Sequence, residues 1–315
     1  MTNQTAKKVQ MFRRWWRIIT GKSVAAVKQQ RGSKWNKDKI CGYYNDMTGK
    51  VSGGTLLDDN GIPLTQIHTG ETVYFPIAIF QYGLGCYDLY LCNEQTMQLS
   101  DFLKIADWAY QHQQCNGAWD CFSVMRSKMY SVSAMGQSEG ASVLARAYVE
   151  TGEEKYKLAA LAAIDFMLRD MKEGGTAMYE NGALYLEEYP QMPRRSVLNG
   201  WIFSLFGLYD AILLEPGKYN MVFSQTVETL RATLSEYDNG YWSMYDLNNN
   251  IASPAYHDLH IALLEVLYEL TGIQEFRTMA TCFSAHKKKR INRLRAICVK
   301  LWQKLTEHTD VVTVQ

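Results

Sequence analysis

The stretch "SAMGQSEGASVLARAYVETG" (residues 133–152), followed directly by "EEKYKLAALAAIDFMLRDM" (residues 153–171), contains the clearest helical pattern in the chain. In the first part the apolar residues recur three or four positions apart, as on one face of a helix, and Gly152 marks the end. The second part repeats this spacing after a very short turn. Two helices joined so closely must lie antiparallel, so the stretch predicts a helical hairpin.

The same pattern recurs on both sides of this hairpin. Further helices are predicted over residues 75–91, 100–114, 196–214, 215–237, 258–272 and 273–305. Ser100 or Asp101 is the expected N-cap of the second of these helices. The intervening pieces, residues 174–193 and 238–257, are rich in Gly, Asn and aromatic residues and alternate enough to indicate short β-hairpins.

These elements predict a mostly α protein, an α/α toroid in which helical hairpins form an incomplete barrel and short β-hairpins lie in the loops. An up-down helical bundle is the alternative, but a bundle does not need such long aromatic loops. The loops fall at corresponding ends of the helical pairs, so in a toroid they would meet at one mouth. A concave, tyrosine-lined cleft of this kind suits a carbohydrate.

Composition narrows the class of protein further. The chain has 315 residues, of which 47% are hydrophobic, enough for one large core, and no low-complexity linker divides it. The net charge of +1 gives no overall field that favours nucleic acid. The seven cysteines are odd in number and form no CxxC pair, so they indicate neither a disulfide framework nor a zinc site, and a reducing compartment is expected.

Both ends of the chain are basic. "KKVQMFRRWWRIITGK" (residues 7–22) lacks the uninterrupted apolar core of a signal peptide, and no segment has the apolar length of a membrane span. We expect a cytoplasmic protein whose first basic segment contacts the anionic inner face of a membrane or a polyanionic glycan; for residues 286–304 a solvated helix face is preferred. The expected division is a basic extension (1–45), the toroid (46–285), and a basic helix and tail (286–315).

Ionisable groups gather in "EEYPQMPRRSVLNG" (residues 187–200), just before a long apolar run. Pro190 keeps Tyr189 out of a helix, an arrangement that can aim a carboxylate and a phenol into a cleft. A solvated turn explains Glu187 and Glu188 equally well. His257 and His260, three residues apart, could form a metal pair, but only Asp258 lies near them as a further ligand, so hydrogen bonding is favoured.

Segments 61–87, 106–119, 133–148, 187–210, 237–247 and 256–260 together resemble the D-glucuronyl C5-epimerases that act on heparosan-type polysaccharides. The order EEYP, VLNG, SLxGLYD, YDL and a late YH is far more specific than any one of these motifs. The resemblance implies an isomerase that inverts C5 of glucuronic acid within a glycan and so produces iduronic acid. It places catalytic roles on Glu188, Tyr189 and Tyr256, and substrate binding on Asn199 and Tyr245.

The residue types suit this reaction on independent grounds. The C5 hydrogen is alpha to a carboxylate, so its removal creates an enolate whose charge must be stabilised. Inversion also needs a base on one face of the sugar and an acid on the other, which two distant loops can supply. The reaction changes no oxidation state, so neither a cofactor nor a metal is expected. The remaining candidates for substrate binding are Arg194, Arg195, His257, Gln137, Tyr82 and Asn248.

The sequence departs from the family in two places. Animal members carry a β-rich domain where Tyr87 and Asp107 are here separated by a short connection, and a homodimer is one way to replace it. They also place an arginine after YDL, where this chain has Asn248. The expected partner is an acidic polysaccharide or lipid-linked glycan, and not nucleic acid. A uronate polysaccharide lyase and an inactive glycan-binding protein are the alternatives.

Overall fold

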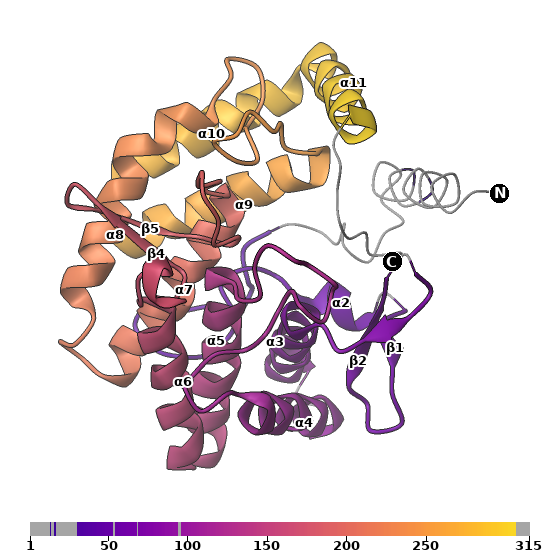
Figure 1. Ribbon diagram of the computed structural model, residues 1–315, viewed down its shortest axis with the longest axis vertical. Coiled ribbons are helices and arrows are strands. Elements are labelled where there is room, and N and C mark those ends of the chain that lie inside the picture. Colours follow the sequence, from indigo (N-terminus) through magenta and orange to yellow (C-terminus); the bar gives the residue numbers. More distant parts are fainter. Residues whose placement is uncertain are drawn as a thin grey trace.

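The computed structural model describes residues 30–52, 54–67, 69–93 and 96–306, together with Arg13 and Trp16. Figure 1 shows that its helices follow one another as hairpins. The hairpins are α3 (Pro76–Asn93) with α4 (Thr96–His112), α5 (Ala134–Thr151) with α6 (Glu154–Met167), α7 (Leu198–Leu214) with α8 (Asn220–Thr233), and α9 (Pro254–Thr271) with α10 (Gln274–Lys288). A last helix, α11 (Arg290–Thr306), follows them.

The first helices of the hairpins form an inner row. Helix α3 packs on α5, α5 on α7, and α7 on α9, while each second helix packs on the outside of its own partner. The inner helices therefore run in the same direction and begin at one rim. The connecting segments 113–133, 168–197 and 234–253 all return to this rim. The described residues thus form an open α/α toroid, and the expected fold class is confirmed.

Smaller elements fill the connections. Helix α2 (Thr48–Ser52) precedes an antiparallel sheet of β1 (Leu56–Leu57), β2 (Pro63–Gln66) and β3 (Thr72–Val73), and short 3-10 helices η2 (Met171–Glu173) and η3 (Leu234–Tyr237) follow α6 and α8. The hairpin expected within residues 174–193 is confirmed as β4 (Ala177–Glu180) paired with β5 (Ala183–Leu186). In residues 238–253 the only β structure is two isolated antiparallel bridges, Asp238 with Ser243 and Met244 with Ile251, so the second expected hairpin does not form paired strands.

Capping explains where the inner helices begin and end. The hydroxyl of Ser133 accepts the Gly136 N–H at 3.3 Å at the start of α5, which ends at Gly152 with a φ of 71°. Helix α9 begins at Pro254, earlier than expected, because Ser253 caps it and proline is favoured in a first turn. Helix α4 begins at Thr96, before the expected cap at Ser100 or Asp101.

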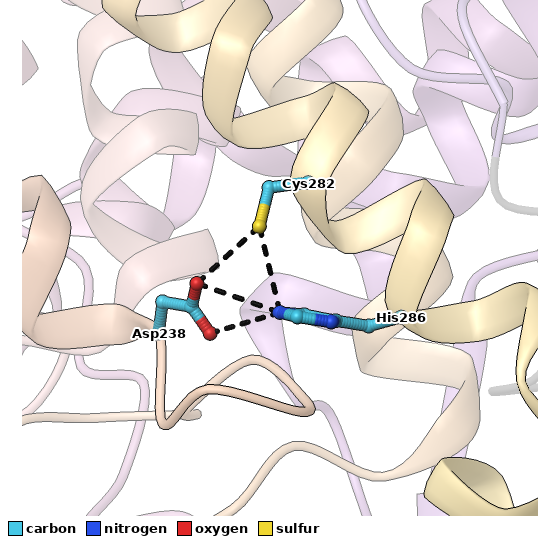
Figure 2. Close-up of side chains that lie close together, drawn as sticks. All are labelled: Asp238, Cys282 and His286. Carbon is cyan, nitrogen blue, oxygen red and sulfur yellow. Dashed lines mark hydrogen bonds and ion pairs between the residues drawn. The ribbon is translucent and has the colours of Figure 1, made fainter.

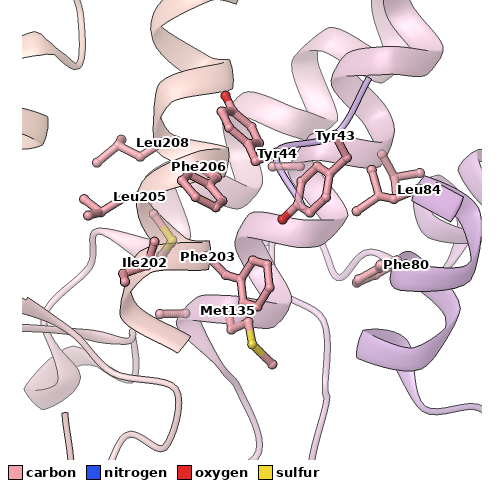
Figure 3. Close-up of a cluster of buried hydrophobic side chains, with 14 of the residues drawn as sticks. Tyr43, Tyr44, Phe80, Leu84, Met135, Ile202, Phe203, Leu205, Phe206 and Leu208 are labelled. Carbon is pink, nitrogen blue, oxygen red and sulfur yellow. The ribbon is translucent and has the colours of Figure 1, made fainter. Parts of the chain in front are cut away.

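The core joins the N-terminal segment to the inner helices (Figure 3). Tyr43 and Tyr44 are buried, and the Tyr44 ring stacks on Phe206 of α7 with a centroid distance of 4.3 Å. Trp35 belongs to the same hydrophobic cluster. The end of the segment expected as a basic extension thus supplies core side chains.

The other expected boundary, at residue 286, falls inside α10. The predicted helix 273–305 is broken at Lys289, whose backbone is extended within a run of like charges that disfavours a continuous helix. Beyond the break, α11 packs on α9 and α10, and its Ala296 is fully buried. Helix α11 is therefore part of the main body.

The membrane contact predicted for residues 7–22 lies outside the described residues, apart from Arg13 and Trp16. Among the helices of the described part, none combines the length and the apolar character that crossing a bilayer requires.

Candidate active site

Glu187 fixes the backbone on which the candidate site is built. Its buried carboxylate accepts the Ser196 N–H at 2.9 Å and the Ser196 hydroxyl at 2.7 Å, and it also accepts the Arg195 N–H at 3.3 Å. Its backbone carbonyl accepts the N–H of Ala134, the first residue of α5. The solvated-turn interpretation of this glutamate is wrong, because its charge is used to hold the turn that enters α7.

Glu188 lies against the first turn of α7. A Cβ atom on Gly200 would be 2.4 Å from the Oε2 atom of Glu188, so the close approach requires glycine at this position. The carboxyl group is only 4% exposed. Burial raises its pKa to about 7, against the lowering effects of a hydrogen bond from Tyr189 and of the Arg195 charge. A carboxyl group with this pKa can both take up and release a proton near neutral pH.

Three tyrosines from separate segments meet beside this carboxyl group. Tyr189 is hydrogen-bonded to Tyr245, whose ring lies 5.1 Å from that of Tyr256 at an angle of 73°. Tyr256 lies in the first turn of α9 and is 41% exposed. Burial raises the pKa of Tyr189 and of Tyr245 well above 10, so both keep their protons at neutral pH.

The two candidate arginines point to different places. Arg195 donates from Nε and Nη2 to Asp246 Oδ2 at 3.0 and 2.5 Å, and its guanidinium group lies 5.2 Å from the centre of the Tyr189 ring. Arg194 instead lies over the ring of Tyr185, at 3.7 Å. Only Arg195 therefore touches the tyrosines, where its charge can act on an anionic ligand.

The two asparagines expected to bind substrate differ in exposure. Asn199 is the second residue of α7; it is 3% exposed, and its Oδ1 atom has no hydrogen-bond partner in the described part of the chain. Asn248 is exposed, and its backbone N–H donates to Asp246 Oδ1 at 3.0 Å. Asn199 is therefore buried in the turn of α7 that also holds Gly200, whereas Asn248 lies at the loop surface.

His257 is not placed to bind a substrate. It is fully buried and stacks on Trp242, its Nδ1 atom accepts the Ser243 N–H at 3.2 Å, and its Nε2 atom lies 3.0 Å from the Phe283 carbonyl oxygen. Burial lowers its pKa to about 4, so the ring is neutral. His260 Nδ1 lies 2.9 Å from the Ser243 hydroxyl, which confirms the preference for hydrogen bonding at this pair.

Gln137 and Tyr82 were also predicted to bind substrate, but both side chains are buried within the fold. The side-chain amide of Gln137 is fully buried. Its Oε1 atom accepts the Trp119 N–H at 3.3 Å and its Nε2 atom donates to the Trp119 carbonyl at 3.1 Å, so it supports the loop before α5. Tyr82 is 6% exposed and is hydrogen-bonded to Cys86 on its own helix. Residue type alone suggested these assignments, but the packing of α3 and α5 occupies both side chains.

Two titratable groups near the site were not predicted from the sequence. Lys300 of α11 is 6% exposed, and its Nζ atom lies 5.5 Å from the centre of the Tyr245 ring. Glu139 of α5 is fully buried, accepts a hydrogen bond from Gln81 at 3.0 Å, and has its pKa raised to about 8 by burial. In the sequence, Lys300 lies four residues after Ala296, a spacing that places both residues on one face of a helix. The structure shows that this face is buried.

Comparison with known proteins identifies the family. The profile of the D-glucuronyl C5-epimerase C-terminus matches residues 111–285, more than half of the chain. The chain belongs to this family. The D-glucuronyl C5-epimerase of Caenorhabditis elegans is 32% identical over 196 residues, which cover 52% of this chain and 31% of that protein.

Other relatives are more distant. An uncharacterized protein of Methanocaldococcus jannaschii is 28% identical over 152 residues, which cover 44% of this chain and 47% of that protein. The chain thus spans less than half the length of either relative. Among solved structures, an unsaturated glucuronyl hydrolase specific for heparin aligns with a TM-score of 0.46 and 11% identity over 70% of this chain and 65% of that chain. An unsaturated glucuronyl hydrolase from Bacillus sp. GL1 aligns with a TM-score of 0.43 and 12% identity over 90% of this chain and 84% of that chain.

Proposed function

We propose that this protein inverts C5 of D-glucuronic acid residues in an acidic polysaccharide or lipid-linked glycan and so forms L-iduronic acid. The observation that carries the proposal is the meeting of Glu188, Tyr189 and Tyr256 at the rim where the inner helices begin. Inversion needs proton-transfer groups from different parts of the chain around one sugar, and this cluster supplies them. Membership in the C5-epimerase family supports the same reaction.

In the first step the C5–H bond breaks and its electron pair enters the enolate of the sugar carboxylate. The proton passes to the Tyr189 oxygen while the Tyr189 O–H proton passes to Glu188. Glu188 is the final acceptor in this scheme because its pKa is about 7, whereas the raised pKa of Tyr189 prevents that phenol from remaining ionised.

In the second step Tyr256 delivers its O–H proton to the opposite face of C5 and regains a proton from water, while Glu188 releases its proton to solvent and neutralises the hydroxide so formed. The dianionic intermediate needs positive charge, which Arg195 and Lys300 provide beside the tyrosines. The N-termini of α7 and α9 contribute further positive potential at the same rim. Lys300 thereby supplies a cation near Tyr245 in a chain that has Asn248, and not arginine, after Leu247.

The reaction is tested by incubating the protein with a heparosan-type polysaccharide in deuterated water. An epimerase incorporates deuterium at C5 and produces iduronate. Formation of an unsaturated uronate that absorbs in the ultraviolet would instead identify a lyase. Binding of the polymer without exchange would identify a glycan-binding protein, and either result would overturn the proposed function.

Replacing Tyr256 with phenylalanine is expected to slow formation of iduronate by about tenfold to 100-fold. This loss is below that of a fully enclosed acid, because Tyr256 is 41% exposed and water can partly replace its hydroxyl. Tyr179→Phe is the matched control, since Tyr179 is also 41% exposed but lies on β4. Equal rates of iduronate formation in the two variants would remove Tyr256 from the mechanism.

Replacing Lys300 with methionine is expected to lower kcat by about tenfold, because one fixed cation is lost where the enolate charge develops. Methionine keeps most of the apolar stem that packs in this buried position. Arg293→Met removes an exposed charge from the same helix and serves as the control. The role given to Lys300 fails if both variants retain the wild-type kcat.

A further inference from the structure

Three side chains with metal-binding atoms come together away from the tyrosine cluster (Figure 2). Cys282 and His286 are one turn apart on α10, and Asp238 directly follows η3. The Nε2 atom of His286 lies 3.1 and 3.4 Å from the two carboxylate oxygens of Asp238 and 3.5 Å from Cys282 Sγ. The Cys282 Sγ atom lies 3.4 Å from Asp238 Oδ2.

Hydrogen bonds account for only part of this arrangement. The Cys282 thiol can donate to Asp238 Oδ2 and the His286 Nε2–H group can donate to the same carboxylate, but the contact between Cys282 and His286 then has no proton of its own. Figure 2 shows that each of the three side chains approaches both of the others, as ligands around a common ion do. A catalytic triad would use both ring nitrogens, one toward the acid and one toward the thiol, which differs from the observed contacts.

The spacing matches the edges of a tetrahedron around zinc. Bonds of about 2.0 Å to oxygen and nitrogen and about 2.3 Å to sulfur give ligand–ligand edges of roughly 3.3 Å and 3.5 Å. The observed separations lie between 3.1 and 3.5 Å. Thiolate, imidazole and carboxylate are a set that zinc accepts, and the thiolate and the carboxylate together balance its double charge.

We propose that Asp238, Cys282 and His286 bind a zinc ion, with water as the fourth ligand. The side chains of Asp238 and His286 are 20% and 13% exposed, so the site is enclosed but reachable from solvent. The carboxylate comes from the start of the segment that carries Tyr245, and the other two ligands come from α10. Bound zinc would therefore hold this segment against α10 and stabilise the fold, without taking part in proton transfer at C5.

The test is a cobalt titration of the full chain after treatment with a chelator. Cobalt bound to a thiolate in a tetrahedral site gives visible d–d bands and a sulfur-to-metal charge-transfer band. We expect saturation at about one equivalent and displacement by zinc. Cys282→Ser should lose the charge-transfer band, whereas Cys298→Ser, which removes an exposed thiol on α11, should keep it.

Thermal unfolding gives a second readout that does not depend on the colour of the metal. Zinc should raise the melting temperature of the wild-type protein and of Cys298→Ser, because a ligand that binds the folded state stabilises that state. The melting temperature of His286→Gln should not rise, because this variant lacks one of the three ligands. Cobalt bands that persist in Cys282→Ser, or the absence of saturable binding to the wild-type protein, would overturn the site. C5 exchange is measured separately, so failure of the zinc site leaves the proposed function standing.

Discussion

Replacing Glu188 with glutamine is expected to reduce C5 deuterium exchange by about 10²- to 10⁴-fold, the usual contribution of a positioned acid–base group. Glutamine has nearly the same shape and fits beside Gly200, but it cannot take up the proton that leaves Tyr189. Because water has little access to this 4% exposed side chain, no solvent molecule can easily replace it. Exchange rates in deuterated water, measured at saturating polymer, give the size of the effect.

The pH profile gives a second and independent signature. The carboxyl group accepts a proton only when ionised, and its pKa is raised to about 7, so exchange should increase as the pH rises through about 7. In Glu188→Gln this acidic limb should disappear from the residual activity. A limb that remains in the variant would assign the titration to another group, such as Glu139, whose pKa is raised to about 8.

Stability separates loss of catalysis from loss of folding. Glu188 has a higher pKa in the folded state than its ordinary value of 4.5, so the folded protein binds this proton more tightly than the unfolded chain. The contribution is fully present below about pH 4.5 and is lost as the pH rises through about 7. At pH 8 Glu188→Gln should therefore be no less stable than the wild type, and Glu180→Gln, an exposed control, should change neither quantity.

The sequence predicted the helical architecture because the signals for it are local. Gly152 ends α5 after a run of regularly spaced apolar residues, and α6 begins two residues later. Repetition of such pairs leaves few arrangements besides an inner and an outer row of helices. The predictions failed where contacts between distant residues determine the structure. Tyr43 and Tyr44 are examples, because they fill space between helices formed by residues far along the chain.

The candidate site was predictable in part for a similar reason. Motif order placed Glu188, Tyr189 and Tyr256 on the list, and the structure brings them together. The sequence does not reveal that Gln137 and His257 are unavailable to a substrate, because their polar atoms are used by neighbouring backbone and hydroxyl groups. Residue type gives the chemistry a side chain can perform, but only its packing says whether that chemistry is available to a ligand.

The Asp238–Cys282–His286 cluster and the position of Lys300 could not be predicted, because both depend on contacts between residues far apart in the sequence. Cys282 and His286 have the spacing of a helical ligand pair, but their third partner, Asp238, lies 44 residues before Cys282 and follows a different helix. Lys300 lies in a segment whose sequence is typical of a basic surface helix, because seven other Lys or Arg residues lie within residues 286–304. In both cases the arrangement depends on how α10 and α11 pack on the segment that carries Tyr245.

The largest stability effect is expected at the ion pair between Arg146 of α5 and Asp210 of α7. The Nη1 atom of Arg146 donates to Asp210 Oδ2 at 2.7 Å, and the two side chains are 1% and 2% exposed. Tyr44 and Ser142 donate to the same carboxylate, at 2.9 and 2.6 Å. Replacing Arg146 with methionine would leave this carboxylate buried without its cation, which costs about 3–5 kcal/mol of unfolding free energy.

Urea denaturation of Arg146→Met measures this cost directly. Arg231→Met provides the control, because Arg231 pairs with Glu228 and Glu275 at the surface, where solvent screens the charges, and little change is expected. The double variant Arg146→Met with Asp210→Leu should recover part of the loss, since neither charge is then left buried alone. If Arg146→Met is no less stable than Arg231→Met, the pair does not hold the inner helices together. The expected recovery in the double variant would show that the loss of stability comes from the unpaired buried carboxylate of Asp210 and not from lost packing around α5.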